Sequence, residues 1–480
     1  DSNSEKLVAA NCYEGLVRIM ADGTIGKGVA TDWNISDDGL TYTFKLRNNS
    51  HWAMFSGHKA VLGENYEDTF DITVKAEDFK FGIERTLSEQ TGSADAPLFS
   101  AVKSISTPDD FTIVFNLSYA DDNFLYALTN PGAMPCDEEF FNLTNGKYGL
   151  DAKYLLCNGP FHVSKWTEKT SVKLAKNNEY NGESSVSPSS VTFYINNDDS
   201  EVADKMNSVT YDVAFLSSSQ FSSIENKKDL NSVAVQNVTY SFIFNQNDNN
   251  YRNKNMRLAF CRSCDTSSLF DSQSDISKAD GIVPPSCKIG GEDYRNGNAA
   301  ELLSYDETLA KKNFNDALLE LGSSSVETTI LCTEQYEPFV KQMVQKLQKT
   351  LGVKFVSTVK VVSESDLEAA VNDGNYSVAF YPFKAKSSFA GEIIEGFDQN
   401  NIFGYESDVL SQKIRNIKNN SGSLEGERSA VADAENYLVS EAVIMPVFYE
   451  NSYFVTSKKT SGIYFYSSAD NVCFINAKKS

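Results

Sequence analysis

Residues 36–47 read Ser-Asp-Asp-Gly-Leu-Thr-Tyr-Thr-Phe-Lys-Leu-Arg, and this stretch gives the first indication of the fold. The Asp-Asp-Gly run near its start is typical of a turn. Tyr42, Phe44 and Leu46 then alternate with polar neighbours, so their side chains share one face of an extended chain. The alternation predicts a half-buried strand that places these three side chains in the core.

The period of the apolar residues changes over residues 76–87. Phe79, Ile83 and Leu87 recur every fourth residue, and acidic and basic side chains fill most of the other positions. A repeat of this kind places apolar side chains along one side of an α-helix. Two acids lie in the first turn, where the helix dipole favours negative charge. Residues 36–87 therefore predict a strand, a loop and an amphipathic helix.

The residues of this region resemble a known family. The turn and strand, followed by Trp52, Ala76-Glu77-Asp78-Phe79 and Glu84-Arg85, are similar to the extracytoplasmic solute-binding proteins that serve peptide and nickel ABC importers. One position departs from the family pattern, because Lys75 stands where relatives have Thr, a good helix cap. We expect Thr73 to cap the helix instead.

Length, composition and charge limit the class of protein. A chain of 480 residues is too long for one hydrophobic core, which predicts two or three domains. The hydrophobic fraction of 41% is that of an ordered globular protein. With 65 acidic and 43 basic residues, the formal charge is −22, and such a surface repels nucleic acid and anionic membrane. We therefore expect no nucleic-acid partner.

Membrane-spanning segments are not apparent in the sequence, because no run approaches the roughly 20 apolar residues that a membrane helix needs. The most apolar segment, residues 442–449, contains Pro446 and is typical of a buried strand. The chain starts without a charged and apolar leader, which we interpret as an export signal already removed.

Eight cysteines are many for a cytosolic protein without a metal motif. Cys136 and Cys157 bracket a polar loop, and we predict a disulfide between them. Cys261 and Cys264 form a Cys-x-x-Cys pair, for which a redox role or a zinc site is an alternative. Structural disulfides in an exported protein are the favoured account, although the sequence leaves their connectivity open.

Three further segments carry the same family resemblance. Residues 11–17 contain a Tyr-Glu-Gly-Leu run similar to the opening of the family, where relatives place the mouth of the ligand cleft. The resemblance implies that Tyr13 and Glu14 contact the ligand, although Glu14 taken alone is equally a solvated acid. Residues 158–182, which begin Asn-Gly-Pro-Phe, are a second match, and the Gly-Ile-Val-Pro-Pro run at residues 281–285 is a third.

The second half of the chain alternates helical and strand patterns. We expect helices over residues 309–321, 339–351, 364–371 and 427–441, and strands over residues 327–331, 354–362, 376–381 and 443–449. Gly322 and Gly352 follow two of the helices, where glycine commonly ends a helix. Alternation of this kind predicts an α/β lobe around a central sheet.

The resemblance implies an α/β, two-lobe periplasmic-binding-protein-like fold of type II, cluster C, with an extra subdomain in lobe one. Lobe one is expected to hold residues 1–245 and 455–480, with the subdomain at about 37–155, and lobe two residues 246–454. A strand over residues 238–245 is expected to run along the hinge between the lobes. Tyr240 and Asn245 are then candidates for ligand contact, with plain packing in the sheet as the alternative for Tyr240.

The sequence shows no recognisable catalytic constellation. Its three histidines follow no zinc-protease spacing, and no Gly-x-Ser-x-Gly elbow occurs. The glycine-rich residues 23–28 lack the pattern of a nucleotide-binding loop and are interpreted as a turn. Paired carboxylates of a secreted hydrolase stay a remote alternative, because acids are plentiful but nothing singles out a pair. We expect no enzyme, no cofactor and no metal.

In the resembling family, one strand offers backbone groups to an extended peptide, which docks as an added strand. The equivalent is expected at residues 378–383. Relatives then carry an acid for the amino terminus of the peptide, whereas this chain has Lys384 and Lys386. Burying an ammonium without an anionic partner costs several kcal/mol, so either another acid such as Glu14 supplies the charge or the ligand has no free amine there. The predicted ligand-binding residues are Tyr13, Glu14, Tyr240, Asn245, Tyr381, Pro382, Phe383, Phe389 and Asn401.

The function that the resemblance implies is the extracytoplasmic substrate-binding component of an ABC importer. Such a protein captures a peptide or peptide-like solute by hinge closure and delivers it to a membrane permease. An oligosaccharide or other non-peptide solute is the alternative, because Tyr381, Phe383 and Phe389 can form an aromatic wall. The resemblance also implies a bacterial monomer that is lipid-anchored at the cell surface or periplasmic.

Overall fold

The computed structural model of the chain describes residues 3–20, 24–182, 185–195, 199–266, 270, 276–384, 389–398, 401–466 and 471–480. The chain forms two compact units. Unit 1 comprises Asp1–Leu216, Gln220–Val233 and Phe454–Ser480, and unit 2 comprises Ser217–Ser219 and Ala234–Tyr453. Two long strands, β11 (Leu230–Phe244) and β18 (Ile444–Ser457), each begin in one unit and end in the other.

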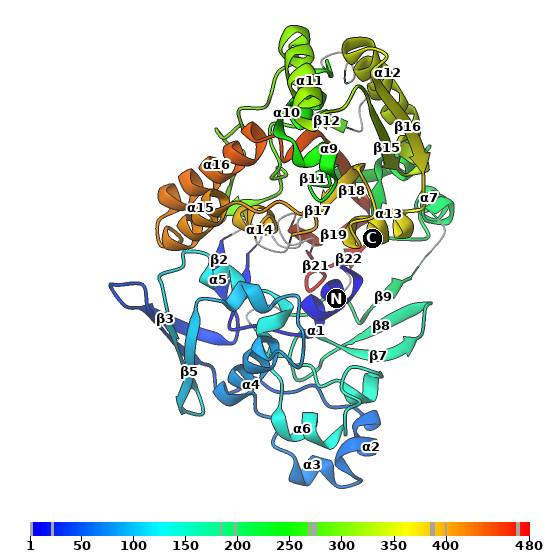
Figure 1. Cartoon of the computed structure of the whole chain (residues 1–480). Coiled ribbons are helices and arrows are strands. Elements are labelled where there is room, and N and C mark those ends of the chain that lie inside the picture. Colours follow the sequence, from blue (N-terminus) through cyan, green and yellow to red (C-terminus); the bar gives the residue numbers. More distant parts are fainter. Residues whose placement is uncertain are drawn as a thin grey trace. The chain divides into compact units, whose positions relative to one another are not determined.

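Unit 1 contains short sheets with helices between them (Figure 1). Its first elements are α1 (Asn3–Cys12), β1 (Val17–Ile19), β2 (Ile25–Lys27), β3 (Ala30–Ile35), β4 (Thr41–Leu46), α2 (Lys59–Leu62), α3 (Tyr66–Thr69), α4 (Ala76–Leu87), β5 (Val102–Asp109) and β6 (Thr112–Leu117). They are followed by α5 (Phe124–Ala127), α6 (Glu138–Leu143), β7 (Phe161–Thr167), β8 (Ser171–Lys176), β9 (Ser190–Tyr194) and α7 (Asp199–Asn207). The chain returns with β19 (Thr460–Ser461), β20 (Tyr464–Tyr466), β21 (Asn471–Cys473) and β22 (Lys478–Lys479).

The strand predicted around Tyr42, Phe44 and Leu46 is β4. All three side chains are buried, as the alternation predicts. β4 lies in an antiparallel sheet of order β3-β4-β6-β5. Phe44 meets Phe115 of β6 edge to face, with ring centroids 5.8 Å apart. The sequence pattern therefore predicted both the strand and the face that it buries.

The helix predicted over residues 76–87 is α4, and its apolar side chains Phe79 and Ile83 are fully buried. Its first turn differs from the expectation. The carboxylate of Asp78 accepts a hydrogen bond from the backbone N–H of Lys75 at 2.7 Å. The predicted Thr73 cap is wrong, because an acid at the third helical position reaches back to a backbone donor that the helix leaves unpaired.

Unit 2 alternates helices and strands as the sequence predicts. After β11, the chain forms α9 (Asn249–Arg252), α10 (Lys254–Arg262), β12 (Ile276–Lys278), β13 (Lys288–Ile289), β14 (Glu292–Asp293), α11 (Glu307–Leu321), β15 (Val326–Cys332) and α12 (Glu337–Leu351). Next come β16 (Phe355–Val361), α13 (Glu364–Asn372), β17 (Val378–Lys384), α14 (Ala390–Glu395), α15 (Asp408–Asn419) and α16 (Leu424–Ser440). β10 (Val213–Ser217) and α8 (Ser218–Ser222) lie at the boundary.

A mixed sheet of order β10-β18-β11-β17-β15-β16, with β12 also paired to β18, forms the centre of unit 2. β11 and β17 pair antiparallel, whereas β15 runs parallel to both β16 and β17. Along β11, Phe242 and Phe244 belong to one buried cluster and Ile243 to another, because successive side chains point to opposite faces. Helices α10, α11 and α12 contribute to the first cluster, and α13 to α16 to the second. Both faces of the sheet are therefore covered.

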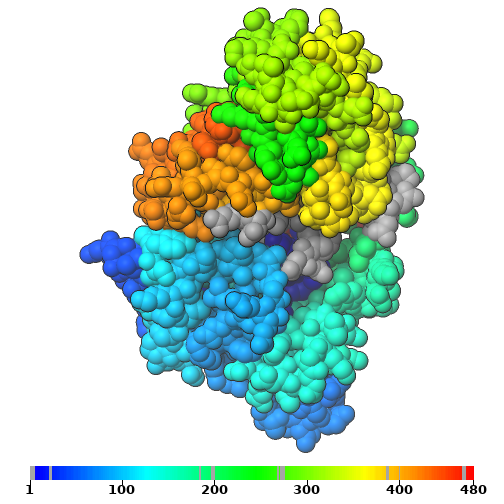
Figure 2. All heavy atoms as spheres, in the orientation of Figure 1, coloured from blue at the N-terminus to red at the C-terminus, as the bar shows by residue number. Residues whose placement is uncertain are grey.

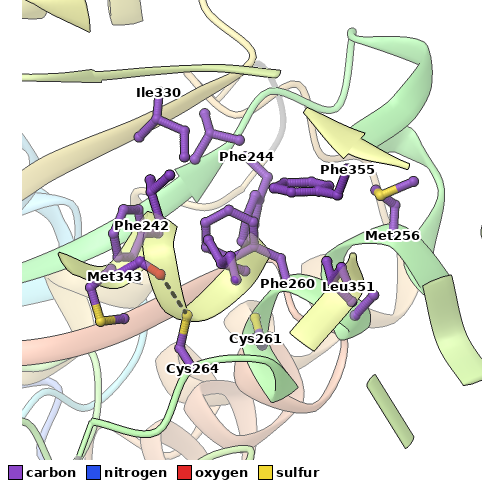
Figure 3. Packing of buried hydrophobic residues seen from close by; sticks show 14 of the residues in the cluster. Phe242, Phe244, Met256, Phe260, Cys261, Cys264, Ile330, Met343, Leu351 and Phe355 are labelled. Carbon is purple, nitrogen blue, oxygen red and sulfur yellow. Dashed lines mark hydrogen bonds between the residues drawn. The ribbon is translucent and has the colours of Figure 1, made fainter. Parts of the chain in front are cut away.

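The first cluster is rich in aromatic and sulfur-containing side chains (Figure 3). Phe242 and Phe244 of β11 pack against Phe260 of α10, with ring centroids 5.3 and 5.1 Å away. The outer sides of α11 and α15 form part of the visible surface of unit 2 (Figure 2). Within the described residues, no helix combines the length and the apolar character needed to cross a membrane.

Candidate functional site

The turn that follows α1 carries the first two predicted ligand-binding residues. Tyr13 is half-buried, and its hydroxyl lies 3.2 Å from the hydroxyl of Tyr148. Burial raises the pKa of Tyr13 well above its usual value, and the nearby Tyr148 adds to the shift. The phenol therefore stays neutral and serves as a hydrogen-bonding group within unit 1.

Glu14 is buried and fully partnered, with 6% of its surface exposed. One carboxylate oxygen pairs with Nη2 of Arg47, and the other accepts a hydrogen bond from the hydroxyl of Tyr180 at 3.2 Å. Nη1 of Arg47 donates to the carbonyl of Gly28 at 2.6 Å. The sequence left open that Glu14 is a solvated acid. This alternative is wrong, because the carboxylate is enclosed and its charge is balanced by Arg47.

In unit 2, Tyr240 lies in a group of aromatic side chains at the edge of the first cluster. Its ring centroid is 4.4 Å from that of Tyr336, 5.1 Å from Phe448 and 5.4 Å from Phe380. Burial raises the pKa of Tyr240, and the carboxylate of Glu450 adds to the effect. Tyr240 therefore packs against other aromatic rings of unit 2. Its side chain is half-buried, so part of it stays exposed.

Glu450 is a member of this group that the sequence pattern did not indicate. Its carboxylate accepts a hydrogen bond from the hydroxyl of Tyr336, and burial raises the pKa of Glu450. The residue lies within β18 and directly follows the apolar run 442–449, so only its position after that run could have pointed to it. The arrangement places a half-buried acid beside the hydroxyl-bearing rings of Tyr240 and Tyr336.

The strand predicted to receive the ligand is β17, and it contains Tyr381, Pro382 and Phe383. Along one edge β17 pairs with β11 from Val238↔Lys384 to Phe244↔Val378. Along the other edge, its described ladder with β15 covers two residue pairs, which lie at the start of the strand. Phe383 packs against Phe397 and Phe403, with ring centroids 5.8 and 5.7 Å away.

Asn245 and Asn401 use their side chains inside unit 2. Nδ2 of Asn245 donates to the carbonyls of Gly374 and Tyr376, both at 2.8 Å. Nδ2 of Asn401 donates to the carbonyls of Asp398 and Tyr405, both at 2.7 Å. Both amides therefore hold loops in place, a role that residue type and position in the sequence do not reveal.

The segment after β17 is described in part. Lys384 is exposed at the end of the strand, and Phe389 is half-buried and forms an isolated backbone bridge with Lys288. Lys386 lies outside the described residues. Contact of the nine predicted residues with a solute stays a prediction.

The loop that contains the Gly-Ile-Val-Pro-Pro run is held by a buried acid that sequence reasoning missed. Oε1 of Glu435 accepts hydrogen bonds from the backbone N–H groups of Ile282 at 2.6 Å and Val283 at 2.9 Å. Arg295 forms an ion pair with the same carboxylate, and Tyr294 donates to it at 3.0 Å. The run therefore owes its conformation to a group more than 150 residues away in the chain.

The predicted disulfide between Cys136 and Cys157 is not formed in this structure, where all eight cysteines are free thiols. The sulfur of Cys136 accepts a hydrogen bond from Nη1 of Arg85 at 3.7 Å. Cys261 and Cys264 lie at the end of α10, buried among apolar side chains (Figure 3). Burial raises the pKa of Cys261 to about 12, which is opposite to the shift of a reactive thiol. In the described part of the chain, no three or more His, Cys, Asp or Glu side chains are grouped as metal ligands.

Two α/β units linked by a pair of long strands, with a mixed sheet covered on both faces in unit 2, define the class of two-lobe binding proteins. Residues 24–403 match the family described as bacterial extracellular solute-binding proteins, family 5, middle region, and the chain belongs to this family. The resemblance noted in the sequence is thereby confirmed.

Individual relatives agree with this assignment. The dipeptide-binding protein DppE of Bacillus subtilis (strain 168) is 23% identical over 476 residues, which cover 94% of this chain and 84% of that protein. A dipeptide-binding protein from Pseudoalteromonas sp. SM9913, solved in complex with Met-Leu, superposes with a TM-score of 0.79 at 18% identity, covering 100% of this chain and 96% of that chain. Listeria monocytogenes OppA bound to peptide gives a TM-score of 0.77 at 21% identity, covering 100% of this chain and 95% of that chain.

Proposed function

We propose that this chain is the substrate-binding component of an ABC importer that captures a peptide or peptide-like solute by hinge closure and delivers it to a permease. The solute is released unchanged, because the protein binds it and makes or breaks no covalent bond in it. Membership of the extracellular solute-binding family supports the carrier role. Two of the relatives, a dipeptide-binding protein and an OppA bound to peptide, support the class of solute.

The observation that carries the peptide proposal is the pairing of β17. Its ladder with β11 extends from Val378 to Lys384, whereas its described ladder with β15 covers only Val378 and Ala379. Residues 380–384 therefore extend beyond the β15 ladder. An extended peptide uses such an edge by adding its own backbone as a further strand, with side-chain selectivity from the flanking residues. Tyr381 and Phe383 alternate along this part of β17 and suit the apolar portions of such a ligand.

Asn245 and Asn401 are proposed to hold the backbone around the solute, because their amides already bond to the chain. Glu14 has a similar place in unit 1, since Arg47 balances its charge. It is therefore a poor anchor for a ligand ammonium, and the segment after β17 brings Lys384 instead of an acid. We infer that the solute does not depend on a free amino group at this strand.

A titration with paired peptides tests this function. Short peptides of two to six residues, each supplied with a free and with an acetylated amino terminus, are added to ligand-free protein in a calorimeter. We expect binding by at least one length class, with affinities of the two forms within about threefold. A loss of affinity of more than about tenfold on acetylation, equal to about 1.4 kcal/mol, contradicts the inference that the solute needs no free amino group. Silence of all peptides in both forms contradicts the peptide assignment.

The location follows from the carrier role. We propose that the protein works outside the cytoplasm as a monomer and is held near its permease by a lipid anchor. Tethering keeps the local concentration at the permease high, which a freely diffusing carrier in an open medium does not achieve. Labelling of the protein by an alkyne fatty acid in producing cells tests the anchor, and light scattering of the purified chain tests the monomer.

A further inference from the structure

Two segments of unit 1, residues 12–14 and 157–159, are joined by hydrogen bonds from the backbone and from one side chain. The N–H of Gly159 donates to the carbonyl of Cys12 at 2.8 Å. The side chain of Asn158 accepts from the N–H of Glu14 at 3.0 Å and donates to the carbonyl of Glu14 at 2.9 Å. Three hydrogen bonds thus hold the turn after α1 against the loop that leads into β7.

The spacing of these segments is too small for a side chain at position 159. A Cβ added to Gly159 would lie 2.6 Å from the carbonyl carbon of Cys12 and 2.7 Å from the N atom of Tyr13. The N–H of Ala53 fixes the other side of the loop by donating to the carbonyl of Cys157 at 2.7 Å. The positions of the backbone at Cys12 and Cys157 are therefore closely determined.

This packing brings two thiols together. Cys12 and Cys157 each expose 1% of their surface and belong to the same hydrophobic cluster. Burial raises the pKa of the Cys12 thiol, and the neighbouring Cys157 thiol adds to the shift, so the two side chains lie close to each other. The sulfur of Cys136, in contrast, faces the guanidinium of Arg85.

We propose that Cys12 and Cys157 are a disulfide-forming pair that locks the Tyr13-Glu14 turn to the loop before β7. Because the native backbone holds the two thiols close to each other, the second step of thiol–disulfide exchange is intramolecular and needs little rearrangement.

The reaction is a two-electron oxidation. Each thiol loses its proton, one S–S bond forms between the two sulfur atoms, and the two electrons reduce the disulfide of an oxidant to two thiols. The oxidant belongs to the class of disulfide-bearing compounds, such as oxidised glutathione or an oxidised thiol–disulfide oxidoreductase. Because both thiols are buried in the folded chain, the exchange takes place during folding, when the oxidant can reach them.

The consequence of the bond is a covalent restraint on the turn that carries two predicted ligand-contact residues. The bond between Cys12 and Cys157 would close a loop of more than 140 residues. Restraining so long a loop reduces the conformational freedom of the unfolded chain. The oxidised chain is therefore expected to melt about 5–10 °C above the reduced chain.

Oxidative refolding of the full chain tests the pair. The protein is unfolded in denaturant, refolded with a mixture of reduced and oxidised glutathione, alkylated while denatured and digested without reduction. We expect mass spectrometry to find a peptide pair joined through Cys12 and Cys157, two hydrogens lighter than its parts and separable by reductant. Finding both cysteines alkylated, or Cys157 joined to Cys136, overturns the proposal.

Melting curves of two variants provide the matched comparison. Cys12→Ser removes one sulfur of the pair, so the difference between oxidised and reduced samples should vanish. Cys136→Ser removes a neighbouring buried thiol and should keep the difference. A difference retained in Cys12→Ser overturns the proposal. The peptide map of the unaltered chain decides the matter by itself if a variant fails to fold.

Discussion

Glu14 shows how a single buried charge depends on one partner. Its carboxylate and the Arg47 guanidinium are 5% and 13% exposed, so neither group is solvated by water when the other is removed. We predict that Glu14→Gln lowers the free energy of unfolding by about 3 kcal/mol, because the buried guanidinium is left without a counter-charge. Urea unfolding followed by fluorescence measures the loss.

The exposed pair of Lys59 and Glu64 provides the control for this variant. The side chain of Glu64 is 83% exposed, so Glu64→Gln should change the unfolding free energy by less than about 0.5 kcal/mol. Equal losses of unfolding free energy in Glu14→Gln and Glu64→Gln would show that burial does not determine how much the Glu14–Arg47 pair stabilises the fold.

His58 carries a prediction about pH. The ring is fully buried, its Nε2 lies 3.0 Å from the carbonyl of Leu155, and burial lowers the pKa of His58 to about 4. The unfolded chain has a histidine pKa near 6.5, so it binds more protons than the folded chain between about pH 4 and 6.5. Stability from this residue is complete above about pH 6.5, falls as the pH drops through this window, and levels below about pH 4.

Urea unfolding at pH 7 and pH 4 measures this effect. We expect His58→Gln to reduce the stability difference between the two pH values by about 3 kcal/mol, since glutamine does not titrate there. A variant with the same pH dependence as the unaltered chain would show that other groups cause the loss.

At the residue scale, the sequence predicted which side chains are buried wherever burial follows from the period of the apolar residues. Tyr42, Phe44 and Leu46 were assigned to the core because their spacing determines the face on which they lie. The pairings of Glu14 with Arg47 and of Cys157 with Cys12 were not predicted, because each joins residues whose separation in the chain carries no signal. Ligand contact by Glu14 was inferred from family likeness, which does not report the charge that faces it.

At the scale of elements, a loop and a helix are joined by the buried ion pair of Glu435 and Arg295. The carboxylate of Glu435, on α16, is 1% exposed and holds the backbone of Ile282 and Val283. We predict that Glu435→Gln lowers the unfolding free energy by about 3 kcal/mol, because it leaves the Arg295 guanidinium unpaired in the interior. Chemical denaturation measures the change.

Asp433 lies on the same helix and is the matched control. Its carboxylate pairs with Lys413 at the surface and is 56% exposed. Asp433→Asn should therefore cost less than about 1 kcal/mol. A loss as large as that of the Glu435 variant would contradict the special role of the buried pair.

The sequence predicted the ends of some elements better than those of others. α4 has the bounds that its apolar period indicates, and α11 and α12 end beside Gly322 and Gly352 as expected. In contrast, β18 extends to Ser457, well past the apolar run that ended at residue 449. A helix is defined by its own repeat, whereas the length of a strand depends on the neighbours with which it pairs.

At the scale of the whole molecule, the family likeness predicted what local patterns could not. Alternating helices and strands indicated an α/β arrangement, but only the resemblance implied two lobes and a carrier. The two units of the chain and the match over residues 24–403 agree with that implication. The solute itself depends on backbone edges and side-chain placement in three dimensions, so the sequence restricted its class without identifying it.

Ligand binding should stabilise the entire chain. A peptide that binds the folded protein alone adds about 2.7 kcal/mol to the unfolding free energy when its free concentration is 100 times its dissociation constant. We predict a rise of several degrees in melting temperature with the peptide that binds most tightly in the calorimeter. An unchanged melting temperature at saturating peptide would contradict binding to the folded state.

Mass spectrometry of the solute carried by the protein tests the carrier assignment most directly. The protein is purified from its producing cells without denaturant, washed, and then denatured to release bound material. We predict the release of one peptide or a small set of peptides, whose masses stay the same after incubation with fresh protein. Release of a defined non-peptide compound would contradict the peptide assignment, and conversion of the added peptide into fragments would contradict the carrier role itself.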